Sequence, residues 1–318
     1  MIKKLWESKN IWSLLLTPLS YLYIIASKLY KIIRKEQVII TPIICVGNAT
    51  LGGAGKTPVA IEIRKTLQGY FKNIFVLTRG YKGKVKGPIL VDSSENFVKF
   101  GDESLIHVKQ GKTCVSKNKY LGAKFCEDLG ADLIIMDDGL QSIDVKKKIK
   151  ILVVDDDYGF GNKRVFPSGP LRTTVKESIE SCDIIIILGN KTFPKKNKFN
   201  HQNKTVYLAK KTLNANKFKN KLLYVFSALG NNKNFHNSLL NEGCKIKKIK
   251  EFPDHYKFTR KDINKILKEA REMKLKIVCT QKDFIKIPCE LKDHIYPIDL
   301  EIKLKNHLEF KNQLLKMI

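Results

Sequence analysis

The sequence predicts an α/β fold built on a mostly parallel sheet that helices cover on both faces. Short apolar runs alternate with segments of helical periodicity, which is the pattern of repeated strand–helix units. The runs are apolar almost throughout, as expected for strands buried on both faces. The first run ends in a glycine-rich turn that opens a helix, so a binding loop is expected at that edge of the sheet.

The elements of the main domain follow in order along the chain. The runs expected as strands are IICV, NIFVLT, TCVS, DLIIMDD, ILVVDD and DIIIIL. Helices are expected over residues 56–67, from about Asp102, and through Cys126. These strands and helices predict one sheet within residues 36–200.

A second, smaller α/β domain is expected over residues 201–318. Residues 189–203 are rich in Asn, Lys and Pro and interrupt the pattern, which indicates a linker. Beyond them LLYVFSAL, KIKKIKEF and KIVCT predict strands, and helices are expected near 234–240 and from about 259 to 273. At 318 residues, two domains are more consistent with the length than one.

The glycine-rich turn has the composition of a phosphate-binding loop. Its sequence, VGNATLGGAGKTP, begins at Val46, and Thr50 stands where the usual G-x-x-x-x-G-K-[ST] pattern has its first glycine. Backbone N–H groups of such a loop bind phosphate oxygens, while Lys56 reaches the β- and γ-phosphates and the Thr57 hydroxyl binds Mg²⁺. The predicted nucleotide-binding residues of the turn are Thr50, Leu51, Gly52, Gly53, Ala54, Gly55, Lys56 and Thr57. The fold class is therefore an α/β, P-loop NTPase-like domain with a smaller second domain.

Two aspartates end the DLIIMDD run. Asp137 and Asp138 would lie at the carboxyl end of a strand, where a P-loop protein needs an acidic partner for Mg²⁺. The pattern does not say which of the two contacts the metal. A similar run at 155–157 competes for the role.

Other chemical groups follow predicted strands or lie in turns. Asp102, in Gly-Asp-Glu-Ser, could simply cap the helix that it begins. Arg79 and Tyr81 follow the NIFVLT strand, at the edge where ligands of open α/β sheets bind. Arg172, in PSGPLR, could contact nucleotide phosphates, and His255 is a lone histidine in FPDHYKF.

The composition is strongly basic, with a formal net charge of +28, but only seven of the 59 basic residues are arginines. Specific nucleic-acid recognition relies on arginine, whereas dispersed lysines suit an anionic membrane surface or are simply solvated. The expected partners therefore include an anionic membrane surface and no nucleic acid. Seven scattered cysteines without a C-x-x-C pair predict neither a disulfide framework nor a zinc site.

The amino-terminal 35 residues predict a membrane-surface helix. Residues 11–27, IWSLLLTPLSYLYIIAS, carry no charge and are flanked by lysines on both sides. The stretch is short for a helix that crosses a bilayer, and its Trp and Tyr residues favour headgroup depth. A buried core helix and a true span are the alternatives.

Taken together, the motifs resemble those of the tetraacyldisaccharide 4'-kinase family, which phosphorylates the lipid A precursor at the membrane surface. The resemblance covers most of the chain through GNATLGGAGKTP, LTRGYKG, GDES, MDDGLQ, GFGN with PSGPLR, FPDHYKF and TQKD, in that order. It implies ATP and Mg²⁺ as cofactors and the acylated disaccharide 1-phosphate as substrate. It also implies a peripheral or monotopic location at the cytoplasmic face of the inner membrane.

The resemblance also implies roles for individual residues. Asp102 would be the base toward the sugar hydroxyl, and His255 would support it, while Lys56 and Asp138 act in catalysis. The implied metal-binding residues are Thr57, Asp137, Asp138 and Glu103. Arg172 would bind nucleotide, and the implied substrate-binding residues are Arg79, Tyr81, Asn48 and Gln141. The chain departs from the family at Ser104, Leu140, Ser142 and Thr173, and over residues 115–119, so the roles of Lys117 and Lys119 stay open.

Two other functions remain possible from the residues alone. The chain could be a P-loop GTPase or ATPase switch that serves a metal or a partner protein, although Thr280-Gln281-Lys282-Asp283 lacks the asparagine of a guanine-reading N-K-x-D segment. A nucleic-acid-binding ATPase would account for the charge, but the sequence shows no arginine–aromatic patch.

Overall fold

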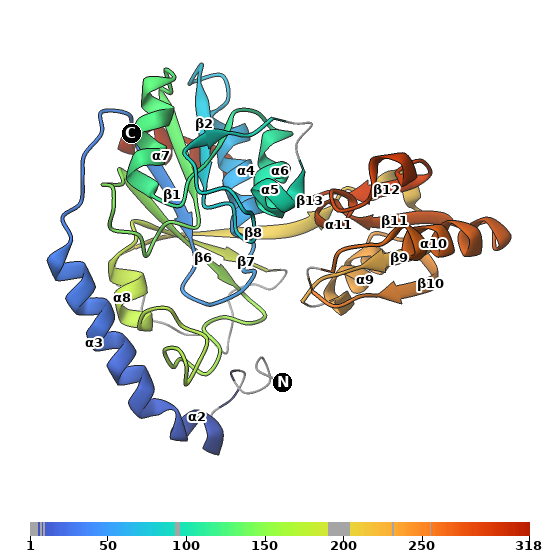
Figure 1. Ribbon diagram of the computed structural model, residues 1–318, viewed down its shortest axis with the longest axis horizontal. Helices are drawn as coiled ribbons and strands as arrows, with labels where there is room; N and C mark the ends of the chain where they lie inside the picture. The colour runs from blue at the N-terminus through green and yellow to red at the C-terminus, as the bar shows by residue number, and fades with distance from the viewer. Residues whose placement is uncertain are drawn as a thin grey trace.

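The structure of the chain is a computed structural model (Figure 1). It describes residues 6, 8, 10–92, 96–189, 204–230, 232–254 and 256–318.

A nine-stranded sheet forms the main domain. Its strands, in order across the sheet, are β13 (Leu300–Leu304), β8 (Thr205–Leu213), β7 (Ile184–Leu188), β6 (Ile149–Asp155), β1 (Ile43–Gly47), β5 (Leu133–Asp137), β2 (Ile74–Thr78), β4 (Thr113–Val115) and β3 (Ile89–Leu90). All neighbouring strands pair in parallel except β13 with β8 and β3 with β4. The predicted α/β class with a mostly parallel sheet is confirmed.

Helices cover both faces of this sheet. The helices of the main domain are α4 (Lys56–Leu67), α5 (Phe97–Phe100), α6 (Asp102–Val108), α7 (Lys119–Asp128), α8 (Val175–Glu180) and α12 (His307–Met317). Alternate residues of β1 point to opposite faces: Ile44 packs in one cluster with α4 and α12, and Ile43 packs in another with α7. Both faces are therefore apolar, which explains the continuous apolar runs of the strands.

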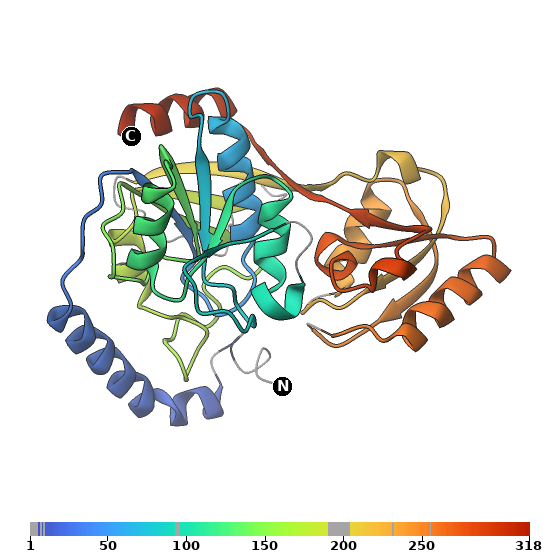
Figure 2. The ribbon, with the colours of Figure 1, turned by 45° about the horizontal axis from the view of Figure 1, so that its top comes forward.

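A second sheet of four parallel strands lies to one side of the first (Figures 1 and 2). Its strands, in order, are β10 (Lys245–Glu251), β9 (Leu222–Ser227), β11 (Lys276–Thr280) and β12 (Ile295–Ile298). Helices α9 (Asn232–Asn241), α10 (Arg260–Glu272) and α11 (Gln281–Phe284) accompany them, with short 3₁₀ turns at Asn216–Phe218 and Cys289–Leu291. The strands and the two longer helices expected from the sequence are all present.

The division of the chain differs from the expected boundary at residue 200. Residues 190–203 of the expected linker lie outside the described part of the chain. Strand β8 follows them, yet it pairs in parallel with β7 of the first sheet. Strand β13 returns from the second sheet to pair with β8, and α12 then packs against α4 on the first sheet. The chain therefore leaves the main sheet after β8 and returns to it at β13, where the two strands pair with each other. The sequence pattern alone did not reveal this return.

The amino-terminal segment forms two helices, α2 (Ile11–Leu15) and α3 (Thr17–Ile33), which run along the outside of the main domain (Figure 2). The exposed apolar side chains of these helices are Ile11, Trp12, Leu14, Leu15, Leu19, Tyr21, Leu22, Tyr23, Ile25, Leu29, Tyr30, Ile32 and Ile33. Their exposure contradicts the alternative of a buried core helix. Within the described chain, no helix has both the length and the apolar character to span a membrane.

Candidate active site

The glycine-rich turn after β1 leads directly into α4. Helix α4 begins at Lys56, so Lys56 and Thr57 occupy its first turn, where backbone N–H groups lack helical partners and attract anions. Gly55 precedes the helix with φ of 84°, and a Cβ on it would lie 2.4 Å from Leu188 Cδ1. The positive φ therefore favours glycine at this point, and any side chain would also have to displace the end of the Leu188 side chain.

A second loop, which contains PSGPLR, forms backbone hydrogen bonds with the turn. The N–H of Leu51 donates to Pro170 O at 2.7 Å, and the N–H of Arg172 donates to Ala49 O at 2.8 Å. Inside the turn, Asn48 Nδ2 donates to Thr50 O at 2.8 Å and to Thr50 Oγ1 at 3.0 Å. The threonine that replaces the usual glycine is thus buried and hydrogen-bonded, so this departure from the pattern preserves an ordered loop.

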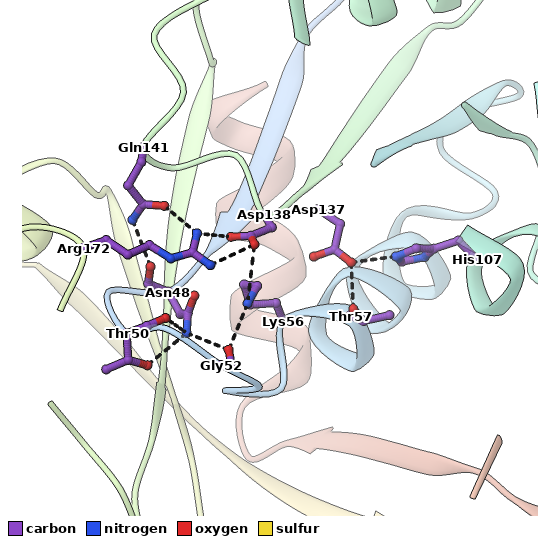
Figure 3. A network of polar contacts seen from close by, with 10 residues as sticks. All are labelled: Asn48, Thr50, Gly52, Lys56, Thr57, His107, Asp137, Asp138, Gln141 and Arg172. Carbon is purple, nitrogen blue, oxygen red and sulfur yellow. Dashed lines mark hydrogen bonds and ion pairs between the residues drawn. The ribbon is translucent and has the colours of Figure 1, made fainter. Parts of the chain in front are cut away.

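Asp138, Arg172, Gln141 and Lys56 form one polar network (Figure 3). Arg172 donates to both oxygens of Asp138, at 2.7 and 3.0 Å, and to Gln141 Oε1 at 3.1 Å. Lys56 Nζ lies 3.8 Å from Asp138 Oδ2, and Gln141 Nε2 donates to Asn48 O at 2.9 Å. The bidentate pair holds Asp138, whose backbone has a φ of 58°, and places two cations beside the glycine-rich turn.

Asp137 belongs to a separate, deeper group (Figure 3). Its Oδ2 accepts from the Thr57 hydroxyl at 2.8 Å and lies 2.8 Å from His107 Nε2 on α6. Burial alone would raise the pKa of Asp137, but the bond and charge of His107, the Lys56 charge and the Thr57 hydroxyl hold it below the usual value. These contacts favour the ionised form of Asp137, which is the form that binds Mg²⁺.

Glu103 brings a further carboxyl group toward this pair from α6. Burial and the Asp137 charge raise the pKa of Glu103, while Lys282 and Lys56 oppose the rise. Asp137 Oδ1, Asn48 Oδ1 and Arg172 Nε are buried without a hydrogen-bond partner among the described residues. Buried polar atoms without hydrogen-bond partners, next to several carboxyl groups, are typical of a site that binds a cation and phosphate oxygens.

These residues fit Mg²⁺ bound in the manner of P-loop proteins. Such a site uses one or two protein oxygens, and phosphates and water complete the coordination. Thr57 Oγ1 and an oxygen of Asp137 are adjacent and could supply them. Among the described residues, no group of three or more His, Cys, Asp or Glu side chains could hold a metal ion.

Asp102 begins α6 on the side that faces the second domain. The preceding Gly101 has φ of 86° and ψ of 158°, and a Cβ on it would lie 2.4 Å from Tyr81 O. This backbone conformation is accessible essentially only to glycine. Gly101 therefore allows α6 to start where Asp102 is buried to 9% exposure beside Lys286 of the second domain.

Gly101→Ala is expected to lower the melting temperature and kcat together, because strain and a clash displace the start of α6. Strain at such positions costs about 1–3 kcal/mol. Gly130→Ala is the matched control, since Gly130 has φ of 79° but no atom within 4 Å of an added Cβ. Thermal melts and initial rates of both variants provide the measurement, and equal melting temperatures with wild-type kcat in both would contradict the expectation.

The structure places the remaining predicted residues as follows. Arg79 follows β2 and is exposed, and Tyr81 is 58% exposed. The substrate-binding roles of these two residues stay predictions. Asp155, the competing aspartate after β6, forms an ion pair with Lys211 of β8. Asp137 instead contacts Thr57, which favours the MDDG aspartates for the metal role. His255 lies outside the described residues.

Sequence reasoning missed two groups at the site, His107 and Lys286, and it left the role of Lys119 open. His107 lies one helical turn after Glu103, so the spacing on α6 could have revealed it. Lys119 Nζ is buried without a hydrogen-bond partner among the described residues, and burial lowers the pKa of Lys119 although Cys45, Asp137 and Asp138 oppose this. Lys286 comes from the second domain, and the sequence holds no local signal for its place.

Known proteins share this architecture and these motifs. The family model described as tetraacyldisaccharide-1-P 4'-kinase matches residues 12–318. A tetraacyldisaccharide 4'-kinase of Paramagnetospirillum magneticum is 33% identical over 301 residues, which cover 93% of this chain and 92% of that protein. One from Rickettsia canadensis is 31% identical over 305 residues, covering 95% and 93%.

A solved structure agrees with the sequence comparisons. The crystal structure of LpxK from Aquifex aeolicus in complex with ATP superimposes with a TM-score of 0.78 at 25% identity, covering 96% of this chain and 99% of that one. These comparisons give no support to the alternative of a nucleotide-dependent switch protein. A glycine-rich turn that opens a helix, paired aspartates and a buried Asp102 thus lie in a chain that matches one family of kinases over residues 12–318, and the chain belongs to the tetraacyldisaccharide 4'-kinase family.

Proposed function

We propose that this chain transfers the γ-phosphoryl group of ATP to the 4'-hydroxyl of a tetraacylated glucosamine disaccharide 1-phosphate at a membrane surface. The 4'-kinase activity follows from the family to which the chain belongs. The observation that best supports it in the structure is the contact of Thr57 with Asp137 beside Lys56 and Asp138, because it joins a phosphate-binding turn to a carboxylate suited to Mg²⁺.

The chain's own groups would bind and orient the nucleotide. Backbone N–H groups of residues 52–57 would surround the β- and γ-phosphates, with Lys56 and Arg172 as cations that offset their charge. Thr57 and Asp137 would hold Mg²⁺, with Glu103 or Asp138 nearby. When bound, Mg²⁺ neutralises charge on the transferring phosphoryl group. Arg172 is paired with Asp138, so Asp138 would orient this cation toward the bound phosphates.

The acceptor hydroxyl would lose its proton to Asp102. Asp102 lies on the same helix as Glu103 and His107, and His107 contacts Asp137, which accepts a hydrogen bond from Thr57 in the first turn of α4. We assign His255 a supporting role on the motif resemblance alone. Arg79, Tyr81, Asn48 and Gln141 are proposed substrate contacts, although Asn48 and Gln141 also have structural bonds within the site.

The decisive experiment is transfer of labelled γ-phosphate from ATP to a purified acylated disaccharide 1-phosphate. Competition with GTP, with ATP limiting, tests the nucleotide in the same assay. Product that carries label at the 4' position supports the proposal, and hydrolysis without transfer to lipid contradicts it.

The anionic membrane surface is proposed as the partner of α2 and α3. One side of these helices exposes the apolar and aromatic side chains named above, and Lys28, Lys31 and Lys35 accompany them. Such a surface suits an interfacial helix that embeds its apolar face at headgroup depth. We infer a peripheral or monotopic association at the cytoplasmic face of the inner membrane.

The opposite side of these helices holds the loop that carries Arg172. Ser20 Oγ donates to Val165 O at 2.8 Å and accepts from the N–H of Ser168 at 3.1 Å. Arg164 donates to Ser13 O at 3.1 Å. A helix embedded in the bilayer surface would therefore keep the active site close to its lipid substrate.

Replacing Leu15, Leu22 and Ile25 together with Ser is expected to release the protein from anionic liposomes and to raise KM for the lipid. The three side chains are 64%, 63% and 55% exposed, so the melting temperature and ATP affinity should stay unchanged. The loss amounts to several kcal/mol, at about 1.5–3 kcal/mol for each apolar side chain withdrawn from the membrane. Liposome flotation, a thermal melt and lipid-dependent rates provide the measurements.

The control for this prediction replaces Leu222, Leu240 and Leu308 with Ser. These leucines are 51%, 52% and 69% exposed but lie outside α2 and α3. Liposome binding should persist in the control. Persistent flotation of the α2–α3 variant together with a collapsed melting temperature would show that these residues stabilise the fold instead.

A further inference from the structure

A buried lysine of the second domain reaches the proposed base of the first. Lys286 follows α11, and its Nζ lies 3.5 Å from Asp102 Oδ2 across the domain boundary. The same Nζ lies 3.5 Å from Asp283 Oδ1 within its own domain. The side chains of Lys286, Asp102 and Asp283 are 1%, 11% and 0% exposed, so the three charges are almost fully removed from solvent.

Hydrogen bonds within the second domain fix Asp283, which lies beside this lysine. Thr280 caps α11, and its hydroxyl donates to Asp283 Oδ2 at 2.7 Å. The N–H of Ala228, at the end of β9, donates to the same oxygen at 3.1 Å. One oxygen of Asp283 is thereby fixed to two elements of the domain, and its other oxygen is the one beside Lys286.

The charge arrangement is difficult to explain as a contribution to stability alone. Lys286 Nζ has no hydrogen-bond partner among the described residues, so the two carboxylates provide its compensating charge. Removing three charges from water costs several kcal/mol for each ion, and apolar side chains of similar volume often serve stability as well or better. The buried charges instead join the two domains at the carboxylate of the proposed base, which favours a role of Lys286 in positioning that carboxylate.

We propose that Lys286 is a positioning residue that holds the Asp102 carboxylate in the orientation needed to receive the proton of the acceptor hydroxyl. This inference rests on the proposed role of Asp102 as the base. Lys286 contacts one oxygen of that carboxylate, so it restricts rotation of the side chain, while Asp283 prevents the lysine from moving away. The second domain thus contributes to catalysis through a buried cation.

The test is a double-mutant cycle in the full-length chain with Lys286→Met and Asp102→Asn. Lys286→Met alone should lower kcat by about 10- to 10²-fold, the loss typical of a small misplacement of a reacting group. KM for ATP should change less than about twofold, because the phosphate-binding residues keep their contacts. In the Asp102→Asn background, Lys286→Met should add less than about a twofold further loss, since its effect acts through Asp102.

Two other variants separate positioning from general stabilisation. Lys286→Arg keeps a cation and should recover part of kcat. Lys292→Met is the matched control: this lysine lies in the same domain, with its Nζ 5.2 Å from the Phe284 ring centroid, and the variant should keep wild-type kcat. If Lys286→Met melts below the assay temperature, the cycle is run with Lys286→Gln, whose amide can still donate to a carboxylate.

The outcomes distinguish this inference from the proposed base. Wild-type kcat in Asp102→Asn would overturn the base assignment itself. A large loss in Asp102→Asn with wild-type kcat in Lys286→Met would overturn only the positioning role. The positioning role would also be overturned if the two losses of kcat multiplied in the double variant. The same holds if Lys286→Met changed only KM for ATP or only the melting temperature.

Discussion

Lys56→Ala is expected to lower kcat by about 10²-fold or more, which makes it one of the two most damaging substitutions foreseen. Lys56 Nζ lies 3.4 Å from Gly52 O and 3.8 Å from Asp138 Oδ2, at the mouth of the phosphate-binding turn. Charge develops on the transferring phosphoryl group, so a cation at this point stabilises the transition state more than the bound ground state. The loss should therefore appear in kcat as well as in KM for ATP.

Lys65→Ala is the control for this prediction. Lys65 lies on the same helix, α4, but is exposed and stands two turns farther from the glycine-rich turn. Steady-state transfer of labelled phosphate and a thermal melt should show wild-type behaviour for Lys65→Ala and a folded, nearly inactive Lys56→Ala. Near-normal turnover of Lys56→Ala would reject the proposed phosphate site.

Asp102→Asn is expected to lower kcat by about 10²- to 10⁴-fold, the range for loss of a general base. The amide has nearly the shape of the carboxylate, but it cannot accept the hydroxyl proton. Because Lys56, Thr57 and Arg172 are unaffected, ATP affinity should be retained, and calorimetric titration with ATP can verify this. Initial rates at saturating lipid and ATP then isolate the chemical step.

A metal-binding role for Asp102 would give a different result. If its carboxylate bound Mg²⁺, the variant would need more Mg²⁺ and excess metal would restore part of the rate. If Asp102 is the base, the kcat of Asp102→Asn should stay low at every Mg²⁺ concentration. Asp128→Asn, at an exposed aspartate that pairs with Lys124, is the matched control and should keep its activity. Unchanged kcat in Asp102→Asn at saturating substrate would dismiss the base assignment.

Local sequence determined the central architecture and the glycine-rich turn. Apolar runs such as residues 43–46 and 184–188 are buried on both faces of the sheet, and that property is written directly in a continuous apolar run. The turn after β1 is equally local, because its glycines, Lys56 and Thr57 are consecutive and α4 begins where they end. The apolar character of α2 and α3 could also be seen in the sequence.

Tertiary structure alone decided which distant groups meet. Arg172 reaches Asp138, and His107 reaches Asp137, only because separate loops and α6 converge at the carboxyl edge of one sheet. The return of β13 and α12 to the first sheet depends on strand pairing across almost a hundred residues, which no periodicity encodes. Lys286 is the clearest case. Its neighbours in the sequence give no sign of a distant partner, and its ion pair with Asp102 forms because the second domain packs against α6. Side-chain contacts between domains are set by the packing of whole elements, so local residue patterns cannot specify them.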